Sequence, residues 1–214
     1  QPQHIAILAA VGHIRPLVAE YPSVELITTG SELVEPDQHP AAGQIRNTNA
    51  SQLMAQFGRM DLQPHYSGIV GDSPSLLLKE IEAGVENHHL TVLTGGVSMG
   101  DHDYVPSMME NAGIEILFHK IAMKPGKPTI FGRKGDHLII GLPGNPVSTF
   151  LQFELLIRPL MHKLMGGDYH PPALRMPMGE DLKQKISDRD SWKPVMFEHG
   201  EVVTLSYHGS GHIH

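Results

Sequence analysis

The chain has 214 residues, of which 40% are hydrophobic and 18% charged, as in ordinary globular proteins that bury a sizeable core. Its net charge of −7 argues against non-specific nucleic-acid binding as its main task, and the absence of cysteine excludes disulfides, thiolate zinc sites and a cysteine nucleophile. No apolar run is long enough to span a bilayer and no secretory signal pattern is present. We expect a cytoplasmic, soluble protein.

The first seventy residues predict a connection and then a strand, a helix and a second strand. Residues 1–22 carry scattered apolar side chains and are expected to connect from an element that precedes them. The first strand is expected over residues 24–28. A helix is predicted over residues 49–57, because Gly58 follows at the place where a helix commonly ends in glycine. The second strand is expected over residues 62–70.

The next fifty residues continue this alternation. Ser73 as N-cap and Pro74 at the first helical position predict a helix that runs to about Glu86. Residues 90–94 form the third expected strand, and residues 114–118 form the fourth after another helix. This β-α-β-α-β-α-β order predicts a three-layer α/β/α domain whose sheet is mainly parallel, with helices on both faces.

The second half of the chain predicts a hairpin, a long helix and a change of domain. The hairpin pairs residues 129–132 with residues 137–141, and the helix runs from Pro146 to the stop at residues 166–167. Pro159 inside this helix predicts a kink, because proline lacks the N–H group that the helix needs. The composition changes at Asp168, so we expect an α/β domain over residues 23–167 and part of a small β domain over residues 168–214. Its strands are expected over residues 183–186, 192–197 and 201–207.

A glycine-rich loop follows the third strand and leads into a helix. There the backbone can approach an anion closely, and a helix N-terminus supplies partial positive charge. The loop lacks the Gly-Lys-Ser/Thr ending of a P-loop and the full dinucleotide spacing, so alone it is a weak signal. We predict that it helps to bind a phosphorylated ligand. Its candidate residues are Thr94, Gly95, Gly96, Ser98 and Gly100.

Three acidic residues follow successive strands: Glu32 after the first, Asp72 after the second and Asp103 after the third. The carboxyl ends of parallel strands gather at one edge of a sheet, so these side chains are expected to converge. Converging carboxylates repel one another unless a cation or proton intervenes, which predicts Mg²⁺ at this edge. The alternative is that each carboxylate caps a helix or accepts hydrogen bonds from loop amides.

Two further loops have residues suited to an anionic ligand. Lys124 and Lys127 flank residues 125–126 in a loop whose prolines restrict its shape, which limits the entropy lost when the ammonium groups grip an anion. A solvated turn with two ordinary lysines is the alternative. The turn made by Pro143, Gly144, Asn145 and Pro146 follows a strand and points free amides at the same edge, although it also fits a plain helix start.

Together these motifs resemble the molybdopterin molybdotransferase family, which includes bacterial enzymes of molybdenum cofactor synthesis and the C-terminal part of gephyrin. The match runs from about Val24 to Gly166. The resemblance implies a molybdopterin-binding α/β domain, a small C-terminal β domain and a homodimer. It also implies that molybdate is inserted into adenylylated molybdopterin with Mg²⁺ and release of AMP. Motif by motif it assigns Glu32 and Asp103 to catalysis or metal binding, Asp72 to metal support, Lys124 and Lys127 to oxyanion binding, and the glycine loop and the turn from Pro143 to Pro146 to the pterin.

The sequence departs from this family at two places. Ser31 stands where family members often have aspartate, which weakens a role for that position. The family's two N-terminal domains are absent, so we expect a fragment. Two alternatives stay open: a molybdopterin adenylyltransferase, which shares the fold but lacks the lysine loop and the C-terminal β segment, and a non-catalytic molybdopterin-binding or scaffold module.

Overall fold

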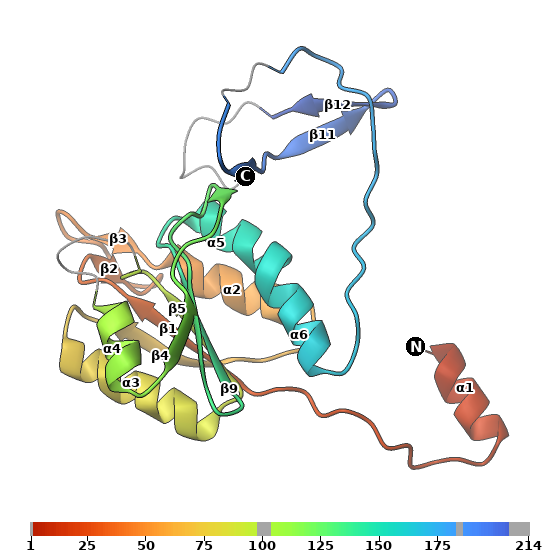
Figure 1. The fold of residues 1–214 in the computed structure, drawn as a ribbon, viewed down its shortest axis with the longest axis horizontal. Helices are drawn as coiled ribbons and strands as arrows, with labels where there is room; N and C mark the ends of the chain where they lie inside the picture. Colours follow the sequence, from red (N-terminus) through yellow and green to blue (C-terminus); the bar gives the residue numbers. More distant parts are fainter. Residues whose placement is uncertain (1, 98–103, 183–185, 206–214) are drawn as a thin grey trace.

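A six-stranded sheet is the centre of the protein in the computed structural model, which describes residues 2–97, 104–182 and 186–205 (Figure 1). In spatial order its strands are β4 (His65–Val70), β1 (Val24–Thr29), β5 (Leu90–Thr94), β9 (His137–Leu142), β8 (Ile130–Lys134) and β6 (Glu115–Phe118). Strands β4, β1, β5 and β9 run parallel, while β8 is antiparallel to both of its neighbours. The predicted mainly parallel sheet is confirmed.

The place of the fourth expected strand was not predictable from the order of elements. It forms β6 at the edge of the sheet, and the hairpin β8–β9 lies between it and β5. Strand β9 is buried over almost its whole length, whereas β6 is mostly exposed. Strand β9 thus takes a central position, where both faces of the sheet are covered, and β6 takes the exposed edge.

Helices cover both faces of the sheet, as the alternation predicted (Figure 1). Phe57, Phe153 and Met161 belong to the apolar core on the face covered by α2 (Thr48–Gly58), α5 (Pro146–Gln152) and α6 (Arg158–Leu164). Ile81 and Met109 belong to the core on the face of α3 (Pro74–Asn87) and α4 (Val105–Asn111). In the part of the chain that the structure describes, no helix is long and apolar enough to cross a membrane.

Helix α2 does not end as the sequence predicted. Gly58 is the last residue of the helix, Arg59 is the C-cap in the right-handed region, and Asp61 has the positive φ of 58°. The helix continues through the glycine because Arg59 N donates to Ala55 O at 3.2 Å. The prediction that Gly58 lies at C′ was wrong. Strand β4 also begins later than predicted, at His65.

The long helix is interrupted just before Pro159. A π-helical segment, η1 (Phe153–Ile157), separates α5 from α6. Proline has no N–H group and its ring collides with the carbonyl group four residues earlier, here that of Leu155 within η1. The predicted disturbance is present, but as a widened turn ahead of the proline. Helix α3 begins at Pro74 as predicted, but the side chain of its N-cap residue, Ser73, makes no capping hydrogen bond.

Both ends of the chain lie outside the central sheet. Residues 1–22, expected as a connection, include the helix α1 (Pro2–Ala10), none of whose residues is buried (Figure 1). At the other end, β11 (Val195–Glu198) and β12 (Glu201–Thr204) form an antiparallel hairpin. The short strands pair as β7 (Met123–Lys124) with β10 (Asp190–Ser191) and β2 (Leu33–Val34) with β3 (Ile45–Arg46). Residues 183–185 and 206–207 of the expected strands lie outside the described residues, and Ile186 is in no strand.

Candidate functional site

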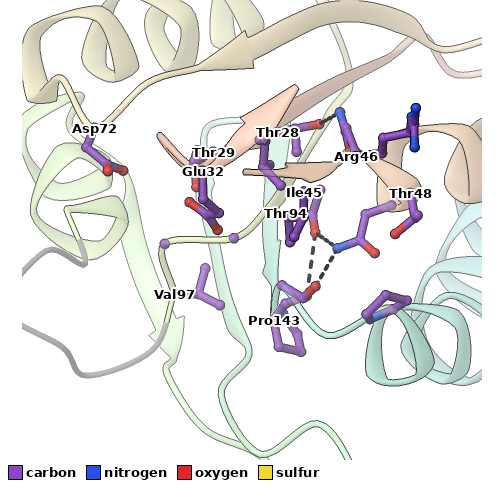
Figure 2. Close-up of a pocket in the computed structure, with 18 residues that line it drawn as sticks. Thr28, Thr29, Glu32, Ile45, Arg46, Thr48, Asp72, Thr94, Val97 and Pro143 are labelled. Carbon is purple, nitrogen blue, oxygen red and sulfur yellow. Dashed lines mark hydrogen bonds between the residues drawn. The ribbon is translucent and has the colours of Figure 1, made fainter. Parts of the chain in front are cut away.

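The carboxyl ends of the parallel strands border a cavity of about 320 Å³, which we call the edge pocket (Figure 2). Thr28 and Thr29 end β1, Thr94 ends β5, and Pro143 follows β9. The pocket therefore occupies the edge at which ligands of open α/β sheets bind. The other residues that line it are Gly30, Glu32, Leu33, Ile45, Arg46, Asn47, Thr48, Asn49, Asp72, Gly95, Gly96, Val97, Gly144 and Pro146.

Asn49 joins three segments of the pocket wall. Its Nδ2 donates to Thr94 Oγ1 at 2.8 Å and to the carbonyl oxygen of Gly144 at 2.9 Å. A carbonyl oxygen only accepts hydrogen bonds, so these contacts fix which end of the amide is nitrogen. Asn49 Oδ1 is then a buried acceptor without a partner among the described residues. Such an atom in the wall of a pocket fits a site that a polar ligand completes.

The glycines after β5 pack directly on β1. A Cβ atom on Gly95 would lie 2.3 Å from Thr29 O, and one on Gly96 would lie 2.8 Å from Thr29 Oγ1. Gly95 and Gly96 also have positive φ values of 92° and 61°. Glycine is therefore required at both positions by space and by backbone conformation. Thr29 Oγ1, beneath them, is a second buried atom that has no partner in the described part of the chain.

Two of the three predicted acidic residues line the edge pocket. Glu32 and Asp72 lie at the end of the pocket opposite Arg46 (Figure 2), and both are exposed. The Glu32 carboxylate lies against Gly30, where a Cβ atom would be 2.7 Å from Oε2. Asp103 lies outside the described residues, as do Ser98 and Gly100. Among the described residues no group of three His, Asp or Glu side chains is arranged to hold a metal ion.

The edge pocket also contains a basic residue, Arg46, that was not predicted from the sequence. Arg46, in β3, lines the opposite end of the pocket and donates from Nε to Pro36 O at 3.1 Å. It is the only Lys or Arg among the pocket-lining residues that the structure describes. No glycine or proline pattern marks this position, and β3 reaches the site only through its pairing with β2. A long-range contact of this kind leaves no local signal in the sequence.

A polar network supports the pocket from behind. Asn47 Nδ2 donates to Thr28 Oγ1 at 3.2 Å and to the Tyr66 hydroxyl at 2.7 Å, and that hydroxyl donates to Glu35 Oε1 at 2.8 Å. Burial, and then the hydrogen bond to Glu35, raise the pKa of Tyr66 to about 12. Asn47 is also the N-cap of α2, since its side chain accepts from Ala50 N. The first turn of α2 is thereby fixed beside the pocket.

The predicted lysines lie elsewhere. Lys124 lines a second cavity of about 390 Å³, the α5 pocket, together with Val147 and Leu151 of α5 and with Trp192 and Lys193. Lys127 is exposed and lines neither cavity. The structure therefore does not bring the lysines into the edge pocket. Pro146 lines the edge pocket and the next residue, Val147, lines the α5 pocket, so the start of α5 borders both cavities.

The turn of residues 143–146 before α5 both lines the edge pocket and caps the helix. Pro143, Gly144 and Pro146 line the edge pocket, whereas Asn145 does not. The side chain of Asn145 accepts a hydrogen bond from Ser148 N at 3.1 Å and so caps α5. The plain helix-start interpretation is thus correct for Asn145, while the three residues around it form part of the pocket wall.

Comparisons with known proteins agree with this geometry. The family model described as "Probable molybdopterin binding domain" matches residues 25–163. The chain is similar to the molybdopterin molybdenumtransferases of Staphylococcus epidermidis (33% identical over 181 residues, 84% of this chain and 43% of the relative) and of Bacillus subtilis strain 168 (35% over 156 residues, 73% and 36%). The crystal structure of the molybdopterin biosynthesis moeA protein from Pyrococcus horikoshii OT3 superposes with a TM-score of 0.78 at 26% identity, over 100% of this chain and 51% of that one. The chain thus spans less than half the length of these two curated relatives.

Proposed function

The chain belongs to the family described as "Probable molybdopterin binding domain", and we propose that it forms the pterin-binding part of a molybdopterin molybdotransferase. In this proposal the complete protein inserts molybdate into adenylylated molybdopterin and releases AMP. The observation that carries the proposal is the edge pocket, which lies at the ligand edge of a parallel sheet inside the matched residues. Its buried, unpartnered acceptor Asn49 Oδ1 fits a ligand that supplies N–H groups, as a pterin does.

We assign the phosphorylated end of the ligand to the glycine loop and the neighbouring helix starts. Gly95 and Gly96 let the ligand approach the backbone because neither carries a side chain. The first turn of α2, beside Thr48, supplies partial positive charge to the same cavity. Arg46 adds a full positive charge at one end. In this arrangement the chain binds and orients the ligand without forming a covalent bond to it.

Mg²⁺ fits the opposite end of the edge pocket. This ion prefers one or two carboxylates together with substrate phosphates and water, and Glu32 and Asp72 are two exposed carboxylates in one cavity. Bound there, Mg²⁺ would neutralise the phosphate charge during cleavage of the anhydride. Asp103 belongs to the same proposal on the basis of its motif alone. Glu32 and Asp72 would hold the ion, and the Glu32 carboxylate lies against Gly30, which leaves room for it because glycine has no side chain.

Molybdate is assigned to the loop of residues 124–128, which we call the lysine loop. Lys124 and Lys193 contribute two positive charges to the α5 pocket, which suits an oxyanion. The start of α5 borders both this pocket and the edge pocket, and in the proposal it holds the two substrates on neighbouring sides of the same helix start. Holding two reactants in position lowers the barrier of a reaction, because the entropy of bringing them together is lost on binding and not at the chemical step.

The test is a titration of molybdopterin into this chain, with and without Mg²⁺, beside the same titration of an Asp103→Ala variant. Binding that Mg²⁺ strengthens in the parent but not in the variant is expected. The activity itself is tested by AMP release from adenylylated molybdopterin with Mg²⁺ and molybdate. Adenylylation of molybdopterin by ATP in the same assay would instead identify an adenylyltransferase, and absence of binding by the folded chain would contradict the proposal.

The remaining expectations from the sequence belong to the same proposal. They are a homodimer, a cytoplasmic location, a domain boundary at residues 167–168 and N-terminal domains joined through residues 1–22. Light scattering coupled to size-exclusion chromatography tests the homodimer, for which a mass of twice 23.5 kDa is expected. Limited proteolysis tests the domain boundary, with first cleavage expected between residues 168 and 175.

A further inference from the structure

The lysine loop is held from the interior of the protein by one side chain. Gln152, the last residue of α5, is 0% exposed, and its Nε2 lies 2.5 Å from Gly126 O and 2.6 Å from Thr129 Oγ1. The Thr129 hydroxyl donates to the same Gly126 oxygen at 2.9 Å. Gln152, Gly126 and Thr129 therefore form a closed triangle of hydrogen bonds beneath the loop that carries Lys124 and Lys127.

The direction of the Gln152 amide is determined by its partner. Gly126 O can only accept, so the atom beside it must be the amide nitrogen. Gln152 Oε1 is then a buried acceptor with no partner in the part of the chain that the structure describes. A leucine would fill a similar volume without leaving this acceptor unsatisfied. The amide at this position thus leaves one acceptor unsatisfied and in return makes two hydrogen bonds to the segment that carries the lysines.

Gly126 fits the triangle because it has no side chain. A Cβ atom there would lie only 2.4 Å from Gln152 Nε2, and the φ of Gly126 is 109°, a region that other residues rarely adopt. The loop backbone can therefore approach α5 closely only with glycine at this position. The amide of Gln152 and the glycine between the two lysines are complementary in shape and in hydrogen bonding.

Helix α5 also connects the loop to both cavities. Pro146 at its start lines the edge pocket, and Val147 and Leu151 line the α5 pocket together with Lys124. Gln152 follows Leu151 directly and holds the backbone two residues after Lys124. We propose that Gln152 is a positioning residue, which fixes the lysine loop against α5 so that Lys124 is held at the α5 pocket in a geometry that binds an oxyanion. This inference rests on the proposed function, in which that oxyanion is molybdate.

The experiment measures three quantities on each purified variant of the chain: the Kd for molybdate alone, the Kd for molybdopterin and the Tm. In Gln152→Leu the molybdate Kd is expected to rise about tenfold, because Lys124 loses its fixed position at the α5 pocket. The molybdopterin Kd and the Tm are expected to change little. Thr129→Val, which removes the hydroxyl without changing the size, is expected to raise the molybdate Kd as well, and Thr129→Ser is expected to restore it.

Gln56→Leu is the matched control. Gln56 is also a buried glutamine and donates to Phe150 O at 3.3 Å and to Glu154 Oε1 at 2.9 Å, but it does not contact the lysine loop. Its molybdate Kd is expected to stay at the parent value even if its Tm falls. An equal rise in Gln56→Leu would show that any damage to α5 weakens molybdate binding, and would overturn the role of Gln152.

Lys124→Ala and Lys193→Ala, which each remove one positive charge from the α5 pocket, separate this inference from the proposed function. If either weakens molybdate binding while folded Gln152→Leu and Thr129→Val bind as the parent does, the role of Gln152 is wrong and the oxyanion role of the α5 pocket stands. If neither lysine variant weakens binding, the oxyanion role fails and that of Gln152 fails with it. Should Gln152→Leu not fold, Thr129→Val and Thr129→Ser decide the question. Equal losses of molybdate and molybdopterin affinity would indicate a general structural defect and overturn the inference.

Discussion

Asn49 Nδ2 donates to the carbonyl oxygen of Gly144 at 2.9 Å, across a separation of 95 residues. The same nitrogen donates to Thr94 Oγ1, so one buried side chain joins the start of α2, the end of β5 and the turn before α5. These three segments are walls of the edge pocket. The shape of the pocket therefore depends on the hydrogen bonds that Asn49 Nδ2 donates. Asn49 Oδ1, the other end of this amide, has no protein partner among the described residues.

Asn49→Asp tests this dependence. The substitution replaces the donor by a carboxylate oxygen that cannot bond to Gly144 O, so a buried acceptor loses its partner. We expect the free energy of unfolding to fall by about 1–3 kcal/mol, and molybdopterin binding to weaken. Chemical denaturation and ligand titration measure the two effects. The control is Gln52→Glu, which alters another α2 amide that bonds to the same turn, at Pro146 O, from outside the pocket. If Gln52→Glu lost ligand binding while Asn49→Asp bound the ligand as the parent does, the role of Asn49 would be contradicted.

Gly95→Ala is expected to weaken ligand binding. The new methyl group would lie 2.3 Å from Thr29 O, a backbone atom that cannot move aside cheaply, and the positive φ of 92° adds strain of about 1–3 kcal/mol. The glycine loop must shift, so we expect at least about a tenfold rise in the molybdopterin Kd. Gly71→Ala is the matched control, since its Cβ meets nothing within 4 Å and its φ is not positive. Parent-like binding by Gly95→Ala would show that the loop geometry is unimportant.

Glu32→Gln tests the metal assignment at the acidic end of the pocket. The substitution removes one negative charge at nearly constant size, so Mg²⁺ loses a ligand while the pocket keeps its shape. Molybdopterin binding without Mg²⁺ is expected to match the parent, whereas the strengthening by Mg²⁺ is expected to fall severalfold. Asp37→Asn, an exposed carboxylate outside the pocket, is the control and should respond to Mg²⁺ as the parent does. An unchanged response in Glu32→Gln excludes Glu32 as a ligand.

The buried carboxyl group of Glu25 is expected to lower the stability of the protein as the pH rises. This residue is 3% exposed in β1, and burial raises the pKa of its carboxyl group, although hydrogen bonds from Ser67 and Thr91 and the nearby His88 act in the opposite direction. Because the folded pKa lies above that of the unfolded chain, the folded state binds more protons in the window above pH 4.5. The contribution of Glu25 to stability is therefore full below the unfolded pKa and declines as the pH rises through the folded pKa.

Glu25→Gln removes this titration. Its Tm relative to the parent is expected to be higher at pH 7 and similar near pH 4, where the parent carboxyl is protonated in both states. Thermal melts of both proteins at several pH values measure the difference. A variant that is less stable than the parent at pH 7, or a difference independent of pH, would show that the buried carboxylate is not the source of the effect.

The sequence by itself determined the local elements and the class of the fold. Pro74 and Pro146 start helices where predicted, and the strands β1, β5 and β9 form at short apolar runs. The alternation of strands and helices along the chain predicted a mainly parallel sheet, which is present. These features depend on neighbouring residues and on backbone preferences that act over one or two turns. The convergence of Glu32, Asp72 and the glycine loop at one edge also followed, because parallel strands end on the same side of a sheet.

Only the tertiary structure decided how distant segments meet. It put β9 beside β5, brought Arg46 to the edge pocket through the pairing of β3 with β2, and separated Lys124 from that pocket. The contacts of Asn49 with Gly144 and of Gln152 with Gly126 likewise join segments far apart in the chain. Such contacts depend on which surfaces pack together, and a single buried amide carries no periodic or turn signal that would reveal its partner. The sequence therefore indicated the sheet edge at which the candidate site lies, and packing selected the side chains that shape its pocket.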